Sequence, residues 1–142
     1  MEATAVGYFM QINGYVIHTD GACKGNPGPG GWGAVIETNG TQEIISGGEP
    51  QTTNNRMEMT AVIKGLEAID PSAPVLISSD STYVINTMTK GWKRKVNHDL
   101  WDQLDRLVKN RDVSWRWVRG HSGDRGNELA DSAATKEAGT AK

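Results

Sequence analysis

The order of the predicted strands and helices indicates an α/β domain built on one mixed sheet. Three strand-like segments come first, and helical and strand-like segments then alternate to the end of the chain. The 142 residues include 37% apolar residues, which suits one folded domain with its own core. Because no repeat, low-complexity segment or linker interrupts the pattern, we expect a single domain at residues 11–138, a flexible tail at residues 1–10 and a C-terminal tail at residues 139–142.

The first three strands are predicted at residues 14–20, 31–37 and 41–48. Each is bounded by turn-forming residues, and β-branched or aromatic residues mark the strands themselves. Residues 38–40 (TNG) form a tight-turn signal, so the second and third strands should pair as a hairpin. Residues 25–31 (GNPGPGG), between the first two strands, predict a loop with almost no side-chain bulk.

The later elements alternate between helix and strand. A helix is predicted at residues 52–69, because capping residues precede it and residues 70–74 (DPSAP) stop it. A short apolar strand at residues 75–80 is typical of a strand buried on both faces of a sheet. Further helices are predicted at 81–90, 100–110 and 127–138 and a strand at 113–118, with a basic loop at 91–99 and a Gly-rich loop at 119–126.

Charge and cysteine content limit the class of protein. The formal net charge is −2, so a nucleic-acid partner would have to be bound by a local basic patch. A single cysteine excludes an internal disulfide and fits a reducing compartment. The N-terminal residues do not fit a signal peptide, and no segment is long and apolar enough to span a membrane, so we expect a cytoplasmic protein with no membrane partner.

Four acidic residues are candidates for one site. Asp20 and Asp80 end two predicted strands, Glu58 lies in the first turn of the predicted helix at 52–69, and Asp131 lies in the last helix. Ligands of open α/β sheets bind outside the carboxyl ends of the strands, so the four could meet there. Clustered carboxylates repel one another unless a cation lies among them, and oxygen ligands suit Mg²⁺ or Mn²⁺. Taken singly, each acid also has an ordinary interpretation as a turn, cap or surface residue.

Five segments together resemble type 1 ribonuclease H in its bacterial form: residues 19–35 (TDGACKGNPGPGGWGAV), 52–62 (TTNNRMEMTAV), 78–84 (SSDSTYV), 115–123 (WRWVRGHSG) and 127–134 (NELADSAA). The resemblance runs from about Val16 to Ala134 and implies a ribonuclease H-like fold, a five-stranded mixed sheet flanked by helices. It also implies a monomeric endonuclease that cleaves the RNA strand of RNA–DNA hybrids and leaves 3′-hydroxyl and 5′-phosphate ends. The implied cofactor is Mg²⁺, for which Mn²⁺ can substitute, with two ions when substrate is bound.

The same resemblance assigns roles to individual residues. The metal-binding catalytic carboxylates would be Asp20, Glu58, Asp80 and Asp131, and His121 on the Gly-rich loop would assist proton transfer or product release. The residues implied to bind substrate are Cys23, Gly25, Asn26, Thr53, Asn54, Asn55 and Ser81. We further expect that the bare loop after Asp20 lets a nucleic-acid backbone come close, since glycine lacks a Cβ, and that main-chain groups there reach the 2′-hydroxyl that distinguishes RNA from DNA.

The sequence departs from many bacterial relatives in one segment. A long basic protrusion that grips the hybrid in those relatives is largely missing here, and residues 90–95 (KGWKRK) remain. Trp92, Lys93, Arg94 and Lys95 form either a reduced clamp for the DNA strand or a solvated loop. Thr82 stands where a glutamine is common in relatives.

Two other functions remain open on the sequence alone. One is a different nuclease of the same fold that acts on DNA, which cleavage of branched DNA substrates would reveal. The other is a non-catalytic hybrid-binding module, which metal-dependent cleavage would exclude.

Overall fold

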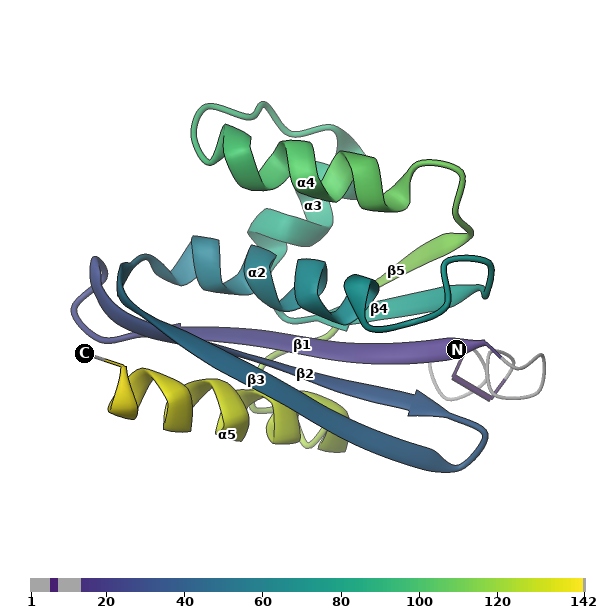
Figure 1. The fold of residues 1–142 in the computed structure, drawn as a ribbon, viewed down its shortest axis with the longest axis horizontal. Coiled ribbons are helices and arrows are strands. Elements are labelled where there is room, and N and C mark those ends of the chain that lie inside the picture. The colour runs from purple at the N-terminus through teal and green to yellow at the C-terminus, as the bar shows by residue number, and fades with distance from the viewer. Residues whose placement is uncertain (1–5, 8–13, 142) are drawn as a thin grey trace.

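The computed structural model describes residues 6–7 and 14–141, and it contains a five-stranded sheet with the strand order β3-β2-β1-β4-β5. β1, β2 and β3 pair antiparallel, whereas β4 is parallel to β1 and β5 is parallel to β4. Helices α2 and α3 cover one face with α4 packed on α2, and α5 covers the opposite face (Figure 1). The prediction of a five-stranded mixed sheet flanked by helices is therefore confirmed.

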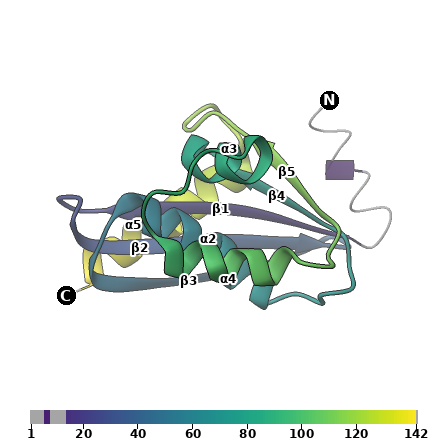
Figure 2. The same cartoon turned by 90° about the horizontal axis from the view of Figure 1, so that it is seen from above.

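The strands are β1 (Tyr15–Cys23), β2 (Gly28–Thr38), β3 (Thr41–Thr52), β4 (Val75–Ser79) and β5 (Val113–Trp117). The helices are α2 (Asn54–Glu67), α3 (Thr82–Lys90), α4 (His98–Val108) and α5 (Arg125–Thr140). Seen from above, the connection at residues 91–97 joins α3 to α4 on the side of the sheet that α2 covers (Figure 2).

The prediction that the first strand ends at Asp20 is wrong. β1 continues to Cys23, and Asp20 pairs with Gly33 within the ladder. β2 begins at Gly28, so residues 28–31 of the loop predicted at residues 25–31 belong to a strand. The reason is packing: a Cβ on Gly31 would lie 2.3 Å from the carbonyl oxygen of Ala134, and one on Gly33 would lie 2.6 Å from that of Ala130. These two glycines let α5 approach the sheet, rather than leave a bare loop for a ligand.

Two helix boundaries also differ from the expectation. Thr52 ends β3, and Thr53 caps α2 by accepting a hydrogen bond from the main-chain N–H of Arg56 (3.2 Å), so Glu58 lies in the second turn of α2 instead of the first. α5 runs to Thr140, so residues 139–140 of the expected C-terminal tail are helical. The expected N-terminal tail lies largely outside the described residues, although Val6 packs against Val16 and Leu76.

The main core lies between the sheet and helices α2 and α4. Ile17 and Ile77 contribute from the sheet, Leu66 from α2 and Trp101 from α4, and each is almost fully buried. Trp115 packs against this core from β5, whereas Trp117 lies at its rim. Among the described helices, none is long and apolar enough to cross a membrane.

Candidate active site

Three of the four predicted acids meet at one point. Asp20 comes from β1, Glu58 from α2 and Asp80 from the residue that follows β4, and each offers a carboxylate oxygen within 4.8 Å of the others. β1 and β4 are adjacent parallel strands, so residues near their carboxyl ends lie side by side. This oxygen-only set is the kind that binds Mg²⁺ or Mn²⁺.

Gly21 allows Glu58 to reach this point. A Cβ on Gly21 would lie 2.4 Å from the main-chain nitrogen of Glu58 and 2.6 Å from the carbonyl carbon of Met57. Only glycine therefore lets α2 approach β1 so closely beside Asp20. Sequence reasoning missed this role, although the glycine directly after Asp20 was a signal for it.

Asp131 reaches the site from the opposite face of the sheet. Its side chain lies near enough to raise the pKa of Asp20, but Asp131 is not one of the three acids that lie within 4.8 Å of one another. The structure thus brings three predicted acids together and places the fourth beside Asp20.

The electrostatics of the site favour a bound cation. Asp20 is 4% exposed, and burial, the charge of Asp80 and the hydrogen bond with Asp131 raise its pKa to about 8. Burial, followed by the charges of Asp20 and Asp80, raises the pKa of Glu58 well above its usual value. Oε1 of Glu58 is buried and has no hydrogen-bond partner among the described residues. A divalent ion would give this oxygen a partner and relieve the repulsion, so the residues present fit such an ion.

The loop that carries His121 lies against Asp80. A Cβ on Gly120 would lie 2.8 Å from Oδ2 of Asp80, so the chain passes the carboxylate closely at this glycine. The next residue, His121, has a positive φ of 56° and an exposed side chain. Trp117 also contacts Asp80, because its indole Nε1 donates a hydrogen bond to the main-chain oxygen of Asp80 (3.1 Å). The sequence analysis assigned no such role to Gly120 or Trp117.

Four of the predicted substrate-binding residues line one pocket at the N-terminus of α2. Asn26, Thr53, Asn54 and Asn55 surround a space of about 510 Å³ together with Val96 and Asn97. Oδ1 of Asn26 accepts a hydrogen bond from the main-chain N–H of Asn54 (2.7 Å), which ties the β1–β2 turn to the start of α2. The remaining N–H groups at a helix start favour an anion such as a phosphate.

The other predicted substrate-binding residues near the site have structural contacts. The thiol of Cys23 donates weak hydrogen bonds to the carbonyl oxygens of Gly28 (3.5 Å) and Thr52 (3.4 Å). Gly25 has a positive φ of 77° in the turn. Oγ of Ser81 caps α3 by accepting a hydrogen bond from the N–H of Val84 (3.1 Å).

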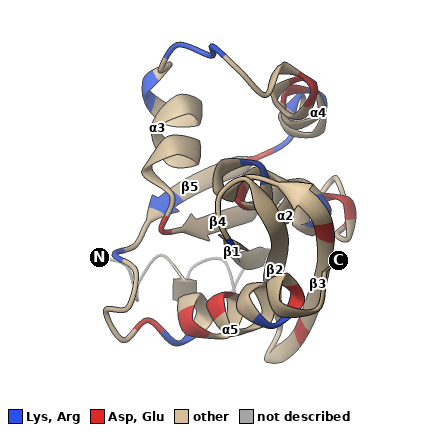
Figure 3. Ribbon diagram, turned by 90° about the vertical axis from the view of Figure 1, so that its left-hand side faces the viewer, with Lys and Arg blue, Asp and Glu red and all other residues tan. Residues whose placement is uncertain are grey.

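Basic residues lie along the connection between α3 and α4 (Figure 3), and their side chains have different environments. Arg94 forms an ion pair with Asp105 (2.6 Å) and lies 5.0 Å from the ring centroid of Trp101, so it anchors the connection to α4. Lys93 and Lys95 are exposed and form no ion pair within the described part of the chain, and 48% of the surface of Trp92 is exposed. A phosphate would therefore have to compete with Asp105 for the guanidinium group of Arg94.

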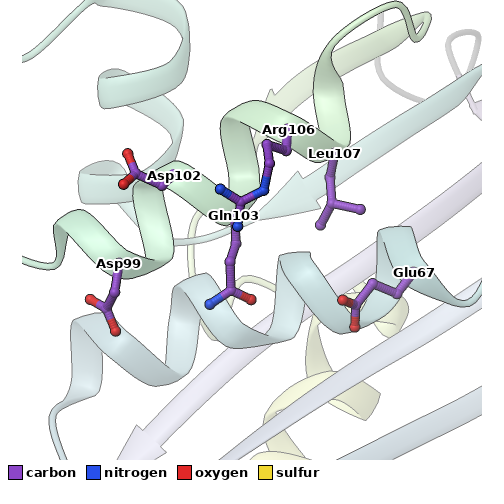
Figure 4. Close-up of a pocket in the computed structure, with 6 residues that line it drawn as sticks. All are labelled: Glu67, Asp99, Asp102, Gln103, Arg106 and Leu107. Carbon is purple, nitrogen blue, oxygen red and sulfur yellow. The ribbon is translucent and has the colours of Figure 1, made fainter.

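A larger groove between α2 and α4, of about 540 Å³, is distinct from the acidic site (Figure 4). Its lining includes the acids Glu67, Asp99 and Asp102, and none of the predicted site residues belongs to it. Asp99 forms an ion pair with Arg56 (2.7 Å), and the hydrogen bond from Arg56 holds the pKa of Asp99 down at about 2. Arg106 is the one basic residue among the lining residues, so the acids outnumber it and the groove is a poorer site for phosphates than the start of α2.

Comparisons with known proteins agree on one family. The RNase H family model matches residues 13–139. Ribonuclease H of Maricaulis maris (strain MCS10) is 50% identical over 132 residues, which are 83% of this chain and 89% of that protein. Among solved structures, LC9-RNase H1, a type 1 RNase H with the type 2 active-site motif, has a TM-score of 0.79 and 34% identity over 90% of this chain and 73% of its own. LC11-RNase H1, solved in complex with an RNA/DNA hybrid, has a TM-score of 0.71 and 26% identity over 86% of this chain and 97% of its own.

Proposed function

The chain belongs to the ribonuclease H family and degrades the RNA of RNA–DNA hybrids, and we propose that Asp20, Glu58, Asp80 and Asp131 carry out this hydrolysis with divalent ions. The observation that carries the proposal is the meeting of three carboxylates from β1, α2 and the end of β4, two of them almost fully buried. Buried acids without a cation would be costly to keep, so their place in the fold points to an ion-binding role.

Each acid has a proposed part in holding two Mg²⁺ ions, for which Mn²⁺ would substitute. Asp20, Asp80 and Asp131 would hold the ion that activates the attacking water, and Asp20 and Glu58 would hold the ion that stabilises the leaving 3′ oxygen. This chemistry would leave 3′-hydroxyl and 5′-phosphate ends. His121, exposed on the loop against Asp80, would assist proton transfer and product release.

The pocket at the start of α2 supports a substrate role for its lining residues. We infer that Asn54, Asn55 and Asn26 contact the hybrid and that Thr53 with nearby amides holds a phosphate of the DNA strand. The main chain of Cys23 and Gly25 and the residue Ser81 would approach ribose hydroxyl groups, since a 2′-hydroxyl distinguishes RNA from DNA. Cleavage should then be largely independent of base sequence.

The short connection between α3 and α4 supports a reduced clamp. Lys93 and Lys95 would face phosphates of the DNA strand and Trp92 its sugars, because all three side chains are exposed. Arg94 would hold the connection in place through Asp105 and Trp101.

The test is a cleavage assay on an end-labelled RNA–DNA hybrid, with single strands, both homoduplexes and branched DNA as comparison substrates. We expect cleavage of the RNA strand in the hybrid with Mg²⁺ or Mn²⁺ and none with EDTA. Hybrid binding without cleavage under any metal condition would contradict the proposed site, and cutting of DNA alone would favour another nuclease activity. Size-exclusion chromatography would test the expected monomer.

A further inference from the structure

Trp117 is a large side chain that stays exposed next to the candidate active site. It is the last residue of β5, an edge strand of the sheet, and 45% of its surface is exposed. The hydrogen bond from its indole Nε1 to the main-chain oxygen of Asp80 (3.1 Å) ties the ring to the acidic cluster. An exposed indole ring held in this way offers an apolar face of fixed orientation to a ligand.

Trp117 separates two hollows, and each contains a cation. One, of about 520 Å³, lies between α3 and β5 and includes Thr82, Lys90 and Trp115. The other, of about 390 Å³, includes Arg119 and part of the loop that follows. Lys90 and Arg119 are exposed, and neither forms an ion pair with any other residue that the structure describes. Unpaired cations on both sides of the ring suit an anionic chain that crosses it.

The strand order decides which part of the substrate could reach this surface. The pocket at the start of α2 adjoins β1 and the β1–β2 turn, Asp80 follows β4, and Trp117 ends β5. The acids therefore lie between that pocket and Trp117. The RNA strand is the one that is cut, so its phosphate lies at the acids, and of the two nucleic-acid strands it is the nearer to Trp117.

We propose that Trp117, with Lys90 and Arg119, forms a subsite for the ribose–phosphate backbone of the RNA strand on one side of the cleaved bond. The indole ring packs against ribose, and the two cations face phosphates. The inference rests on the proposed function, and it adds a contact to the RNA flank that the four acids do not provide.

The test combines a variant with truncated substrates. Each hybrid has one position at which the RNA can be cleaved and the same DNA strand. The RNA strand is shortened either on the 5′ side or on the 3′ side of that position. The affinity of the protein for each hybrid is then measured by fluorescence anisotropy in EDTA. The wild type should lose about fivefold in affinity for one of the two truncations, the lower end of the effect of losing a nucleotide–aromatic contact. Trp117→Ala should bind the full hybrid about fivefold more weakly and be insensitive to that truncation.

Control variants separate this contact from support of Asp80. Trp117→Phe keeps a ring without the N–H, and it should bind almost as the wild type does. Ile44→Ala changes an exposed apolar residue (47%) on β3, the opposite edge strand, and should have no effect. Lys90→Ala and Arg119→Ala leave the ring intact, and each should lower the slope of log affinity against log salt by roughly 0.7–0.9.

Three results would overturn the proposal. If the losses of binding free energy from Trp117→Ala and from the RNA truncation simply add, the ring does not contact the truncated part of the RNA. A loss in Trp117→Phe as large as in Trp117→Ala, or a fall in kcat with unchanged affinity, would show that Trp117 only supports Asp80. By contrast, a wild type that binds these hybrids with the expected length dependence and cleaves none of them would refute the proposed function and not the subsite.

Discussion

Replacing Asp20 with asparagine is expected to stabilise the metal-free protein at neutral pH. Burial, followed by the charge of Asp80 and the hydrogen bond with Asp131, raises the pKa of Asp20 from 3.8 to about 8. A carboxyl group with a raised pKa binds more protons in the folded than in the unfolded chain between these two values. The stability of the wild type therefore falls as the pH rises from about 4 to about 8.

The size of the effect follows from that interval. Asp20 stays protonated in the folded state from its unfolded pKa of 3.8 up to pH 7, which lowers the free energy of unfolding by about 1.4 kcal/mol per pH unit. At pH 7 the loss is about 4 kcal/mol. Water that enters the acidic cluster when Asp20 ionises lowers this figure, so we expect a gain of about 2–4 kcal/mol from Asp20→Asn. The asparagine oxygen can still accept the N–H of Gly21, a hydrogen bond of 2.9 Å in the wild type. The melting temperature should rise by roughly 7–13 °C, because the unfolding entropy of a chain of this length converts each kcal/mol into about 3 °C.

Thermal melts in EDTA at pH values from 4 to 8 measure this effect. Asp102→Asn, which changes an exposed acid of α4, is the matched control and should melt as the wild type does at every pH. Mg²⁺ should narrow the difference, because an ion neutralises the charge that the substitution removes. A wild-type stability that does not change over this pH range, or an Asp20→Asn protein no more stable than the wild type at pH 7, would refute the reasoning.

Four further outcomes are expected. Asp80→Asn should abolish hybrid cleavage and leave the circular dichroism spectrum unchanged, and substantial residual cleavage would argue against the proposed site. His121→Ala should lower kcat by about 100-fold or less with hybrid affinity unchanged, since water can replace a group that assists proton transfer; complete inactivity or lost binding would point to another role. Changing Lys93 and Lys95 together to Ala should raise KM, leave kcat near wild type and reduce the salt slope by roughly 0.7–0.9 per contact, whereas equal affinity at all salt concentrations would identify a solvated loop. Arg94→Ala should mainly lower the melting temperature, because the structure pairs Arg94 with Asp105; a loss of affinity without a loss of stability would contradict that interpretation.

Local patterns were sufficient to predict most elements and the meeting of the acids. The strand at 75–80 and the helices at 81–90 and 100–110 depend on apolar runs, caps and breakers that lie within a few residues of one another, and the structure confirms each with small shifts of its ends. Asp20 and Asp80 could be assigned to one edge because ligands of open α/β sheets bind outside the carboxyl ends of the strands, and each acid follows the last β1–β4 pair, Thr19 with Ser79. The family resemblance supplied the roles of Glu58 and Asp131, which spacing alone left open.

The sequence by itself determined the order of the elements and the acidic residues of the site. Only the tertiary structure decided the contacts of four residues, Gly31, Gly33, Arg94 and Trp117. Gly31 was predicted at the end of a bare loop and Gly33 in the strand that follows, but both glycines let α5, from the far end of the chain, pack closely on the sheet. The sequence left Arg94 either in a clamp for the DNA strand or in a solvated loop, and only the structure shows its contacts with Asp105 and Trp101. Trp117 gained its position beside Asp80 from the pairing of β4 with β5. These roles depend on partners from distant segments, and a contact between distant segments exists only after the chain has folded and excluded water between them.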